Sequence, residues 1–261
     1  AIKTNSQGFR TESLDRIAAS PGRKAVLLGG SAMWGYMATS DATTIPGALQ
    51  GELDARGIDI RTVNLAQPGF NFMQELITFQ RVALSLRPDY IIVMNGVNDI
   101  IMTVMQPGPG LPLGWIQSYN LMHEGTRALE RQQSPLRSLA GSMRLVGLLR
   151  GRQTRGFEFL NKATERGAVF HHENDEEIKR RIVEQYYINV RSQLLLAQGY
   201  DIPCIVVLQP GIVTVQPQNA QENALSADHP LLAELMPALR EKLDLLAAEF
   251  HVVIADGADI L

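Results

Sequence analysis

The chain has 261 residues, a hydrophobic content of 45%, a formal net charge of −3 and a pI near 6.0. This length and composition suit one globular domain with a full hydrophobic core. The charge balance lacks the basic footprint of nucleic-acid binding, and no apolar stretch approaches the roughly 18 residues of a membrane-spanning helix.

Five apolar runs alternate with segments of helical spacing along the chain. The expected strands are 24–28, 58–63, 90–94, 203–208 and 250–254, and the expected helices are 46–56, 70–86, 175–198 and 230–248. This alternation is typical of a parallel sheet with helices on both faces. The single cysteine, Cys204, lies in the fourth expected strand and is expected to be a buried core residue.

The first expected strand ends at two glycines, Gly29 and Gly30, which precede Ser31. Glycines at this point let the chain turn sharply into a helix. Ligands of open α/β sheets bind outside the carboxyl ends of the strands, where Ser31 would therefore lie. Two interpretations remain at this point: Ser31 is an exposed nucleophile, or it caps the following helix.

The second expected strand is followed by the turn Pro68-Gly69. A glycine at this position can bring its N–H close to a substrate, because no Cβ intervenes. The alternative is an ordinary turn between a strand and a helix.

The third expected strand is followed by Gly96, Asn98 and Asp99. The Asn98 amide can donate to an oxyanion, whereas Asp99 can cap a helix or hold the loop. The three strand ends together predict a nucleophile, Ser31, and three oxyanion donors: the N–H groups of Ser31 and Gly69 and the side chain of Asn98.

The connection 100–174 is far longer than usual and leaves directly from the predicted site. We interpret it as a helical lid over the site. A surface that contacts a partner protein or a membrane, and a merely solvated insertion, are the alternatives.

The three motifs resemble blocks of the SGNH family of GDSL-like hydrolases. The matching residues are Gly30-Ser31 for the Ser block, Gly69 for the Gly block and Gly96-x-Asn98-Asp99 for the Asn block. Residues 5–10, 44–46 and 208–210 further resemble the bacterial extracytoplasmic branch that acts on polysaccharides or their acyl decorations.

This resemblance implies one three-layer α/β/α, flavodoxin-like domain over 1–261, with a five-stranded parallel sheet. It also implies a serine esterase that needs no cofactor or metal, with Gly30, Gly96 and Asp99 supporting the site. The implied reaction removes acyl groups, O-acetyl above all, from a carbohydrate or another small ester. The alternatives are an O-acyltransferase that uses the same serine and a noncatalytic carbohydrate-binding or assembly module.

The sequence departs from the family in its last residues. The family carries Asp-x-x-His after its last strand, and that His takes the serine proton. This motif is absent from the sequence, where Asp256-x-x-Asp259 has the spacing without the base. We expect the His block to lie outside this sequence; a catalytically inactive relative is the alternative.

The five histidines offer no convincing substitute for this base. Asp228-His229 places an acid beside a histidine, but neighbouring side chains usually point apart. His171 and His172 lack the i, i+4 spacing of a helical zinc site, so no metal is expected.

Overall fold

The computed structural model describes residues 3–104, 176–211, 213–214, 223 and 230–257. The chain divides into two compact units, 1–101 with 179–261 and 102–178, and the sheet belongs to the first. Nearly all of the predicted insertion 100–174 lies outside the described residues, so its lid interpretation stays a prediction. His123, His171, His172, His229 and Asp259 also lie outside them.

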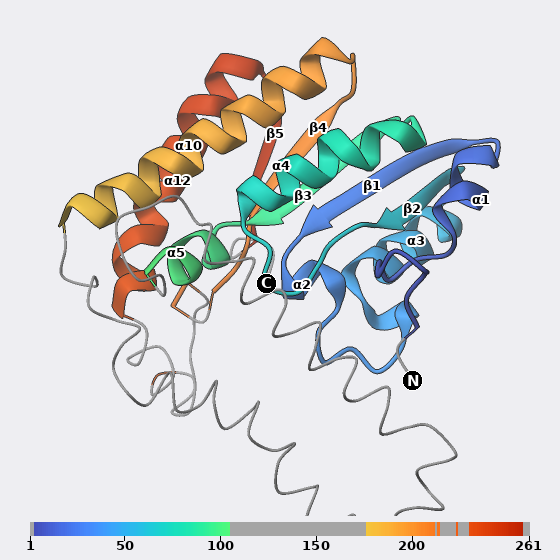
Figure 1. The fold of residues 1–261 in the computed structure, drawn as a ribbon, viewed down its shortest axis with the longest axis horizontal. Helices are drawn as coiled ribbons and strands as arrows, with labels where there is room; N and C mark the ends of the chain where they lie inside the picture. Colours follow the sequence, from blue (N-terminus) through green and yellow to red (C-terminus); the bar gives the residue numbers. More distant parts are fainter. Residues whose placement is uncertain (1–2, 105–175, 212, 215–222, 224–229, 258–261) are drawn as a thin grey trace, which may run out of the picture. The chain divides into compact units, whose positions relative to one another are not determined.

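Five parallel strands form one sheet in the order β2-β1-β3-β4-β5 (Figure 1). The strands are β1 Arg23–Gly29, β2 Ile60–Asn64, β3 Tyr90–Asn95, β4 Cys204–Leu208 and β5 Val253–Asp256. An all-parallel sheet in this order is the flavodoxin-like arrangement of doubly wound proteins. The predicted α/β fold with a five-stranded parallel sheet is therefore confirmed.

The helices flank the sheet on both faces (Figure 1). The described α-helices that follow β1 are α2 Ser31–Trp34, α3 Ile45–Ala55, α4 Phe72–Arg81, α5 Val97–Val104, α10 Glu176–Gly199 and α12 Pro230–Phe250. The remaining helical segments are α1 Leu14–Ala19 and the short 3₁₀ turns η1 Asp41–Thr43 and η2 Ala83–Leu86.

Side-chain contacts identify the two outer layers. On one face, Leu49 of α3 packs against a core that contains Leu27 of β1 and Met94 of β3. On the other, the rings of Phe72 in α4 and Tyr186 in α10 meet edge to face, with centroids 6.0 Å apart. Ion pairs Lys179–Glu234 and Arg191–Glu249 join α10 to α12, so α4, α10 and α12 form one layer.

Strand β1 lies inside the sheet and pairs with both of its neighbours. Leu27 is opposite Asn64 of β2 and Ile92 of β3, and every residue from Lys24 to Gly29 is buried. Burial on both faces explains why this strand is a continuous apolar run in the sequence. The carboxyl ends of β2, β1 and β3 consequently lie side by side at one edge of the sheet.

Two expected boundaries are wrong by three residues or more. The expected helix 70–86 ends at Arg81, because Val82 leaves helical geometry with a φ of −122° and a 3₁₀ turn follows. The expected strand 250–254 starts instead at Val253, since Phe250 still belongs to α12 and His251 reverses the chain with a φ of +53°.

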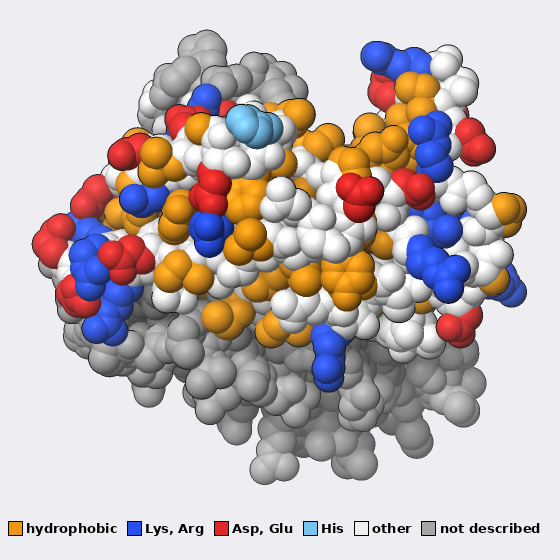
Figure 2. Space-filling model, turned by 90° about the horizontal axis from the view of Figure 1, so that it is seen from above, with side chains coloured by type: hydrophobic (Ala, Val, Ile, Leu, Met, Phe, Trp, Pro, Cys, Tyr) orange, Lys and Arg blue, Asp and Glu red, His pale blue; other side chains and the backbone are white. Residues whose placement is uncertain are grey.

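Burial along β4 alternates between the two faces of the sheet. Cys204, Val206 and Leu208 are buried, whereas Ile205 and Val207 are half-buried. Figure 2 shows one face of the molecule, on which acidic and basic side chains surround a band of apolar ones. None of the described helices combines the length and the apolarity that crossing a membrane requires.

Candidate active site

Ser31 is the first residue of α2, and its position depends on the two glycines before it. A Cβ on Gly29 would lie 2.7 Å from both the Met33 Cβ and the Met94 carbonyl oxygen, so a larger residue cannot fit. Gly30 is the N-cap of α2, without a side-chain cap, and the interpretation of Ser31 as the helix cap is wrong. Ser31 is half-buried, and its hydroxyl makes no hydrogen bond within the described part of the chain.

Asn98 lies directly beside the backbone that precedes the serine. A Cβ on Gly30 would be 2.4 Å from the Asn98 Nδ2 and 3.3 Å from the Phe70 carbonyl oxygen. The Asn98 Nδ2 donates a 2.8 Å hydrogen bond to that same carbonyl. The loops that follow β1, β2 and β3 therefore meet at Gly30, next to Ser31.

Gly69 lies in the loop after β2, one residue before the carbonyl that Asn98 binds. Its φ of +77° belongs to the left-handed region, which glycine occupies without strain. Among the described residues, no protein acceptor is recorded for the N–H groups of Gly69 and Ser31. Asn98 also keeps a second amide hydrogen beyond the one it gives to Phe70. Each of the three predicted oxyanion donors thus has an N–H to offer.

Asp99 connects the loop after β2 with the loop after β3. Its Oδ1 accepts from the Phe72 N–H at 3.0 Å, at the start of α4, and its Oδ2 accepts from the Gly96 N–H at 3.2 Å. Burial raises the pKa of Asp99 to about 6, although these two backbone N–H groups favour its charged form. Asp99 therefore holds the loop, which is one of the two roles its sequence position suggested.

A series of buried, hydrogen-bonded side chains lies next to Asp99. The Tyr186 hydroxyl donates to the Asn95 Oδ1 at 2.9 Å, and the Asn95 Nδ2 donates to the Glu75 Oε2 at 2.9 Å. Burial, and secondly the charge of Asp99, raise the pKa of Glu75 well above its ordinary value, while its bond from Asn95 acts in the opposite direction. The same burial raises the pKa of Tyr186.

These hydrogen bonds, which link β3, α4 and α10, were not predicted from the sequence. Tyr186 fits the apolar spacing of its helix, and Glu75 fits the first turn of a surface helix. The available signal was Asn95, a polar residue in the last position of an otherwise apolar strand.

The described residues do not supply the histidine base. His251 comes before β5, so it lies at the amino edge of the sheet, opposite the edge that carries Ser31. Asp256 ends β5 at the correct edge, but its carboxylate pairs with Arg240 of α12. Within the described ranges, no cluster of three or more His, Cys, Asp or Glu side chains could hold a metal ion.

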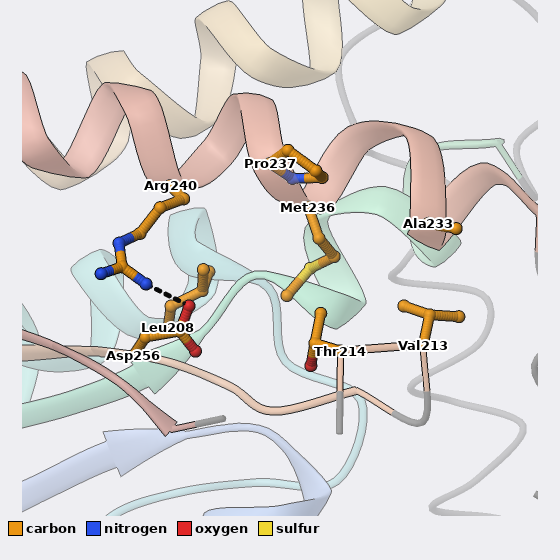
Figure 3. Close-up of a pocket in the computed structure, with 8 residues that line it drawn as sticks. All are labelled: Leu208, Val213, Thr214, Ala233, Met236, Pro237, Arg240 and Asp256. Atoms are coloured by element: carbon orange, nitrogen blue, oxygen red, sulfur yellow. Dashed lines mark hydrogen bonds and ion pairs between the residues drawn. The ribbon is translucent and has the colours of Figure 1, made fainter. Parts of the chain in front are cut away.

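A cavity of about 210 Å³ lies beside this ion pair (Figure 3). Met236 and Pro237 of α12 border it on one side, and the Arg240–Asp256 pair borders it on another. None of its lining residues belongs to the loops that carry Ser31, Gly69 and Asn98. The cavity nevertheless adjoins the loop after β3, because a Cβ on Gly96 would lie 2.8 Å from the Cδ1 of Leu208, which lines the cavity.

Comparisons with known proteins return structural neighbours only. No known family model matches the chain, and no curated protein matches it. A catalytic mutant of an acetylxylan esterase from Geobacillus stearothermophilus is 14% identical, with a TM-score of 0.45 over 91% of this chain and 77% of that one. A protein of the G-D-S-L family from Desulfitobacterium hafniense is 12% identical, with a TM-score of 0.46 over 89% of this chain and 76% of that one. A GDSL-like lipase from Bacteroides thetaiotaomicron is 11% identical, with a TM-score of 0.44 over 93% and 74%.

Proposed function

We propose that the chain is a serine esterase that removes acyl groups, in particular O-acetyl groups, from a carbohydrate or another small ester. One observation carries the proposal: the Asn98 amide nitrogen lies against Gly30 while it binds the carbonyl of Phe70. Beside this contact lie the Ser31 hydroxyl, which bonds to none of the described residues, and the loops whose N–H groups we propose as oxyanion donors.

In the proposed reaction, the Ser31 Oγ attacks the ester carbonyl carbon and loses its proton to a base. The carbonyl oxygen becomes an oxyanion, which accepts from the N–H groups of Ser31 and Gly69 and from the Asn98 amide. Collapse of this intermediate breaks the bond to the alcohol, which takes up a proton and leaves an acyl group on Ser31. Water then attacks the acyl-enzyme and releases the acid. An O-acyltransferase would differ only in the last acceptor, a sugar hydroxyl in place of water.

A noncatalytic carbohydrate-binding module is the second candidate function. The observation in its favour concerns the position at which the family carries Asp-x-x-His. The sequence lacks Asp-x-x-His, and the Asp256 carboxylate is engaged by Arg240. A serine without a base keeps the weak nucleophilicity of an alcohol.

Hydrolysis of p-nitrophenyl acetate by the wild type and by Ser31→Ala tests the proposal. Without a base, the oxyanion donors alone leave an acceleration of about 10³–10⁴ over water, and this residual rate does not require the serine, so we expect slow turnover that Ser31→Ala changes little. Added imidazole should supply the missing base and raise the Ser31-dependent rate. The same imidazole with Ser31→Ala gives the background that must be subtracted.

Acetylated xylooligosaccharides separate the two candidate functions. Release of acetate that disappears in Ser31→Ala supports the esterase, and transfer of acetyl to an added sugar supports the acyltransferase. Binding of the oligosaccharide, without Ser31-dependent turnover of any ester under either condition, would establish the binding module instead.

A further inference from the structure

The segment 5–10, which we call the N-terminal clip, folds into a closed turn. The Asn5 side-chain oxygen accepts from the N–H groups of Gln7 and Phe9, both at 3.0 Å, and the Asn5 N–H donates to the Phe9 carbonyl at 2.9 Å. The Phe9 side chain is part of the core. These bonds fix the backbone that delivers the next residue, Arg10.

Arg10 is almost completely buried against the end of the serine helix. Its Nη1 donates to the Gly35 carbonyl and its Nε to the Asp41 carboxylate, both at 2.8 Å. Its guanidinium carbon lies 5.3 Å from the centre of the Trp34 ring. Only 3% of the Arg10 side chain is exposed, compared with 74% of that of Asp41. A buried guanidinium needs such partners, because water no longer solvates it.

Gly35 connects Arg10 to the nucleophile. The N–H groups of Gly35 and Tyr36 both donate to the Ser31 carbonyl, at 3.1 and 2.9 Å. Gly35 has a φ of +87°, and a Cβ there would lie 2.3 Å from the Thr44 Cγ2 and 3.1 Å from the Arg10 Nη1. The turn that closes on Ser31 is therefore held from outside by Arg10.

The clip also reaches the second loop of the site. The Gly8 carbonyl accepts a 3.0 Å hydrogen bond from the Gln67 side chain, two residues before Gly69. The Gln67 N–H in turn donates to the Gly29 carbonyl at 3.1 Å, two residues before Ser31. One short segment thus contacts both the nucleophile turn and the loop of an oxyanion donor.

We propose that Arg10 is a positioning residue of the active site: through the Gly35 carbonyl it fixes the turn that carries Ser31. Its Nη1 and Nε are engaged by Gly35 and Asp41, so it acts through the turn rather than on the substrate. Its effect on catalysis rests on the proposed esterase function, whereas its effect on the turn does not. The Asp41 carboxylate offsets part of the cost of burying the guanidinium, and the Gly35 bond is the contact through which Arg10 reaches the turn.

Two measurements test this role, one on the turn and one on the chemistry. In Arg10→Ala, amide hydrogen exchange at Gly35 and Tyr36 should accelerate about tenfold or more, the effect of losing one hydrogen bond from a charged donor. Exchange in β1 and β3 should stay unchanged. The rate of Ser31 phosphonylation by a fluorophosphonate should fall by a similar factor. So should kcat for p-nitrophenyl acetate in the presence of imidazole, while KM changes less than about twofold.

Matched variants make the result specific. Arg56→Ala removes an exposed arginine from the end of α3 and should change neither measurement. Arg10→Lys should recover only part of the effect, because a single ammonium cannot reproduce the guanidinium fork. Millimolar methylguanidine added to Arg10→Ala should restore the rate of phosphonylation, because it can occupy the space of the missing guanidinium. It would not restore the rate if the variant had simply unfolded.

Unchanged exchange at Gly35 and Tyr36 in both Arg10 variants would overturn the proposal. So would faster exchange throughout β1 and β3, because Arg10 would then stabilise the whole fold rather than the turn. If wild-type Ser31 neither reacts with the fluorophosphonate nor turns over any ester, the esterase proposal fails. The exchange measurement would still decide whether Arg10 holds the turn.

Discussion

Gly30 shows how closely the residues of the candidate site are packed. We predict that Gly30→Ala lowers Ser31-dependent esterase activity by about 10²-fold, comparable to loss of one oxyanion donor. The reason is steric: the new Cβ would lie only 2.4 Å from the Asn98 Nδ2, closer than two such atoms can approach, and would displace the amide. Steady-state kinetics and thermal unfolding of the variant measure the two consequences.

Gly51→Ala is the matched control for this prediction. Gly51 lies in α3, and a Cβ added there would have no other atom within 4 Å. The change should therefore leave activity intact and stabilise the helix by up to about 1 kcal/mol. Full activity in Gly30→Ala would show that Asn98 does not contribute to the site as proposed.

Asp99 gives the protein a specific pH dependence. Its pKa is raised to about 6 in the folded state, so the folded protein binds more protons than the unfolded chain between about pH 4 and pH 6. The free energy of unfolding should therefore fall as pH rises through this window, because ionisation of the buried carboxyl is unfavourable. Asp99→Asn should flatten this part of the profile.

Urea unfolding at half-unit steps from about pH 4 to pH 7.5 measures this dependence. Asp15→Asn, at an exposed position in α1, serves as the control and should leave the profile as in the wild type. An identical slope in Asp99→Asn and wild type would assign the dependence to other groups, such as the buried Glu75, whose pKa is also raised.

At the scale of elements, the start of α4 depends on a reciprocal cap. The Asn71 side chain accepts from the Gln74 N–H at 3.3 Å, and the Gln74 side chain accepts from the Asn71 N–H at 2.9 Å. We predict that Asn71→Ala lowers the free energy of unfolding by about 1–2 kcal/mol, because the capped N–H groups lose their partners. Chemical denaturation measures the change.

Ser13→Ala provides the comparison for this cap. Ser13 occupies the same position before α1 but makes no side-chain hydrogen bond to that helix. Its loss should change stability by less than about 0.5 kcal/mol. Equal effects of the two substitutions would mean that the cap at Asn71 contributes nothing.

The sequence predicts the strands and the site loops well because both have local signals. The apolar run before Gly29 and the glycines around Ser31 and Asn98 each mark the end of a strand. Boundaries at Val82 and His251 were missed, since a single unusual φ ended an otherwise regular pattern.

The hydrogen bonds that hold the site loops from other elements could not be predicted in the same way. Tyr186 binds Asn95 across 91 residues, and Arg10 binds Gly35 across 25. In neither pair does the sequence around one residue indicate which residue it binds. Only the packing of α10 and of the N-terminal clip against the sheet brings them together.

At the scale of the whole molecule, the strand order separates sequence neighbours. β1 must pair with β3 as well as β2, so the centre of the sheet joins residues about 65 positions apart, such as Ala25 and Tyr90. Such non-local pairing is typical of slowly folding topologies. The central strands β1, β3 and β4 should accordingly open only when the whole domain does.

Cys204 allows the opening of the central strands to be measured chemically. It is the only cysteine of the chain, it lies on β4, and burial raises its pKa to about 12. A thiol reagent needs the thiolate and physical access, and the folded sheet denies it both. We predict that a maleimide adds once per molecule and only at the rate of global unfolding, so that mass spectrometry of the adduct over hours reports the lifetime of the native state. Rapid modification under native conditions would reveal that the sheet opens locally at β4.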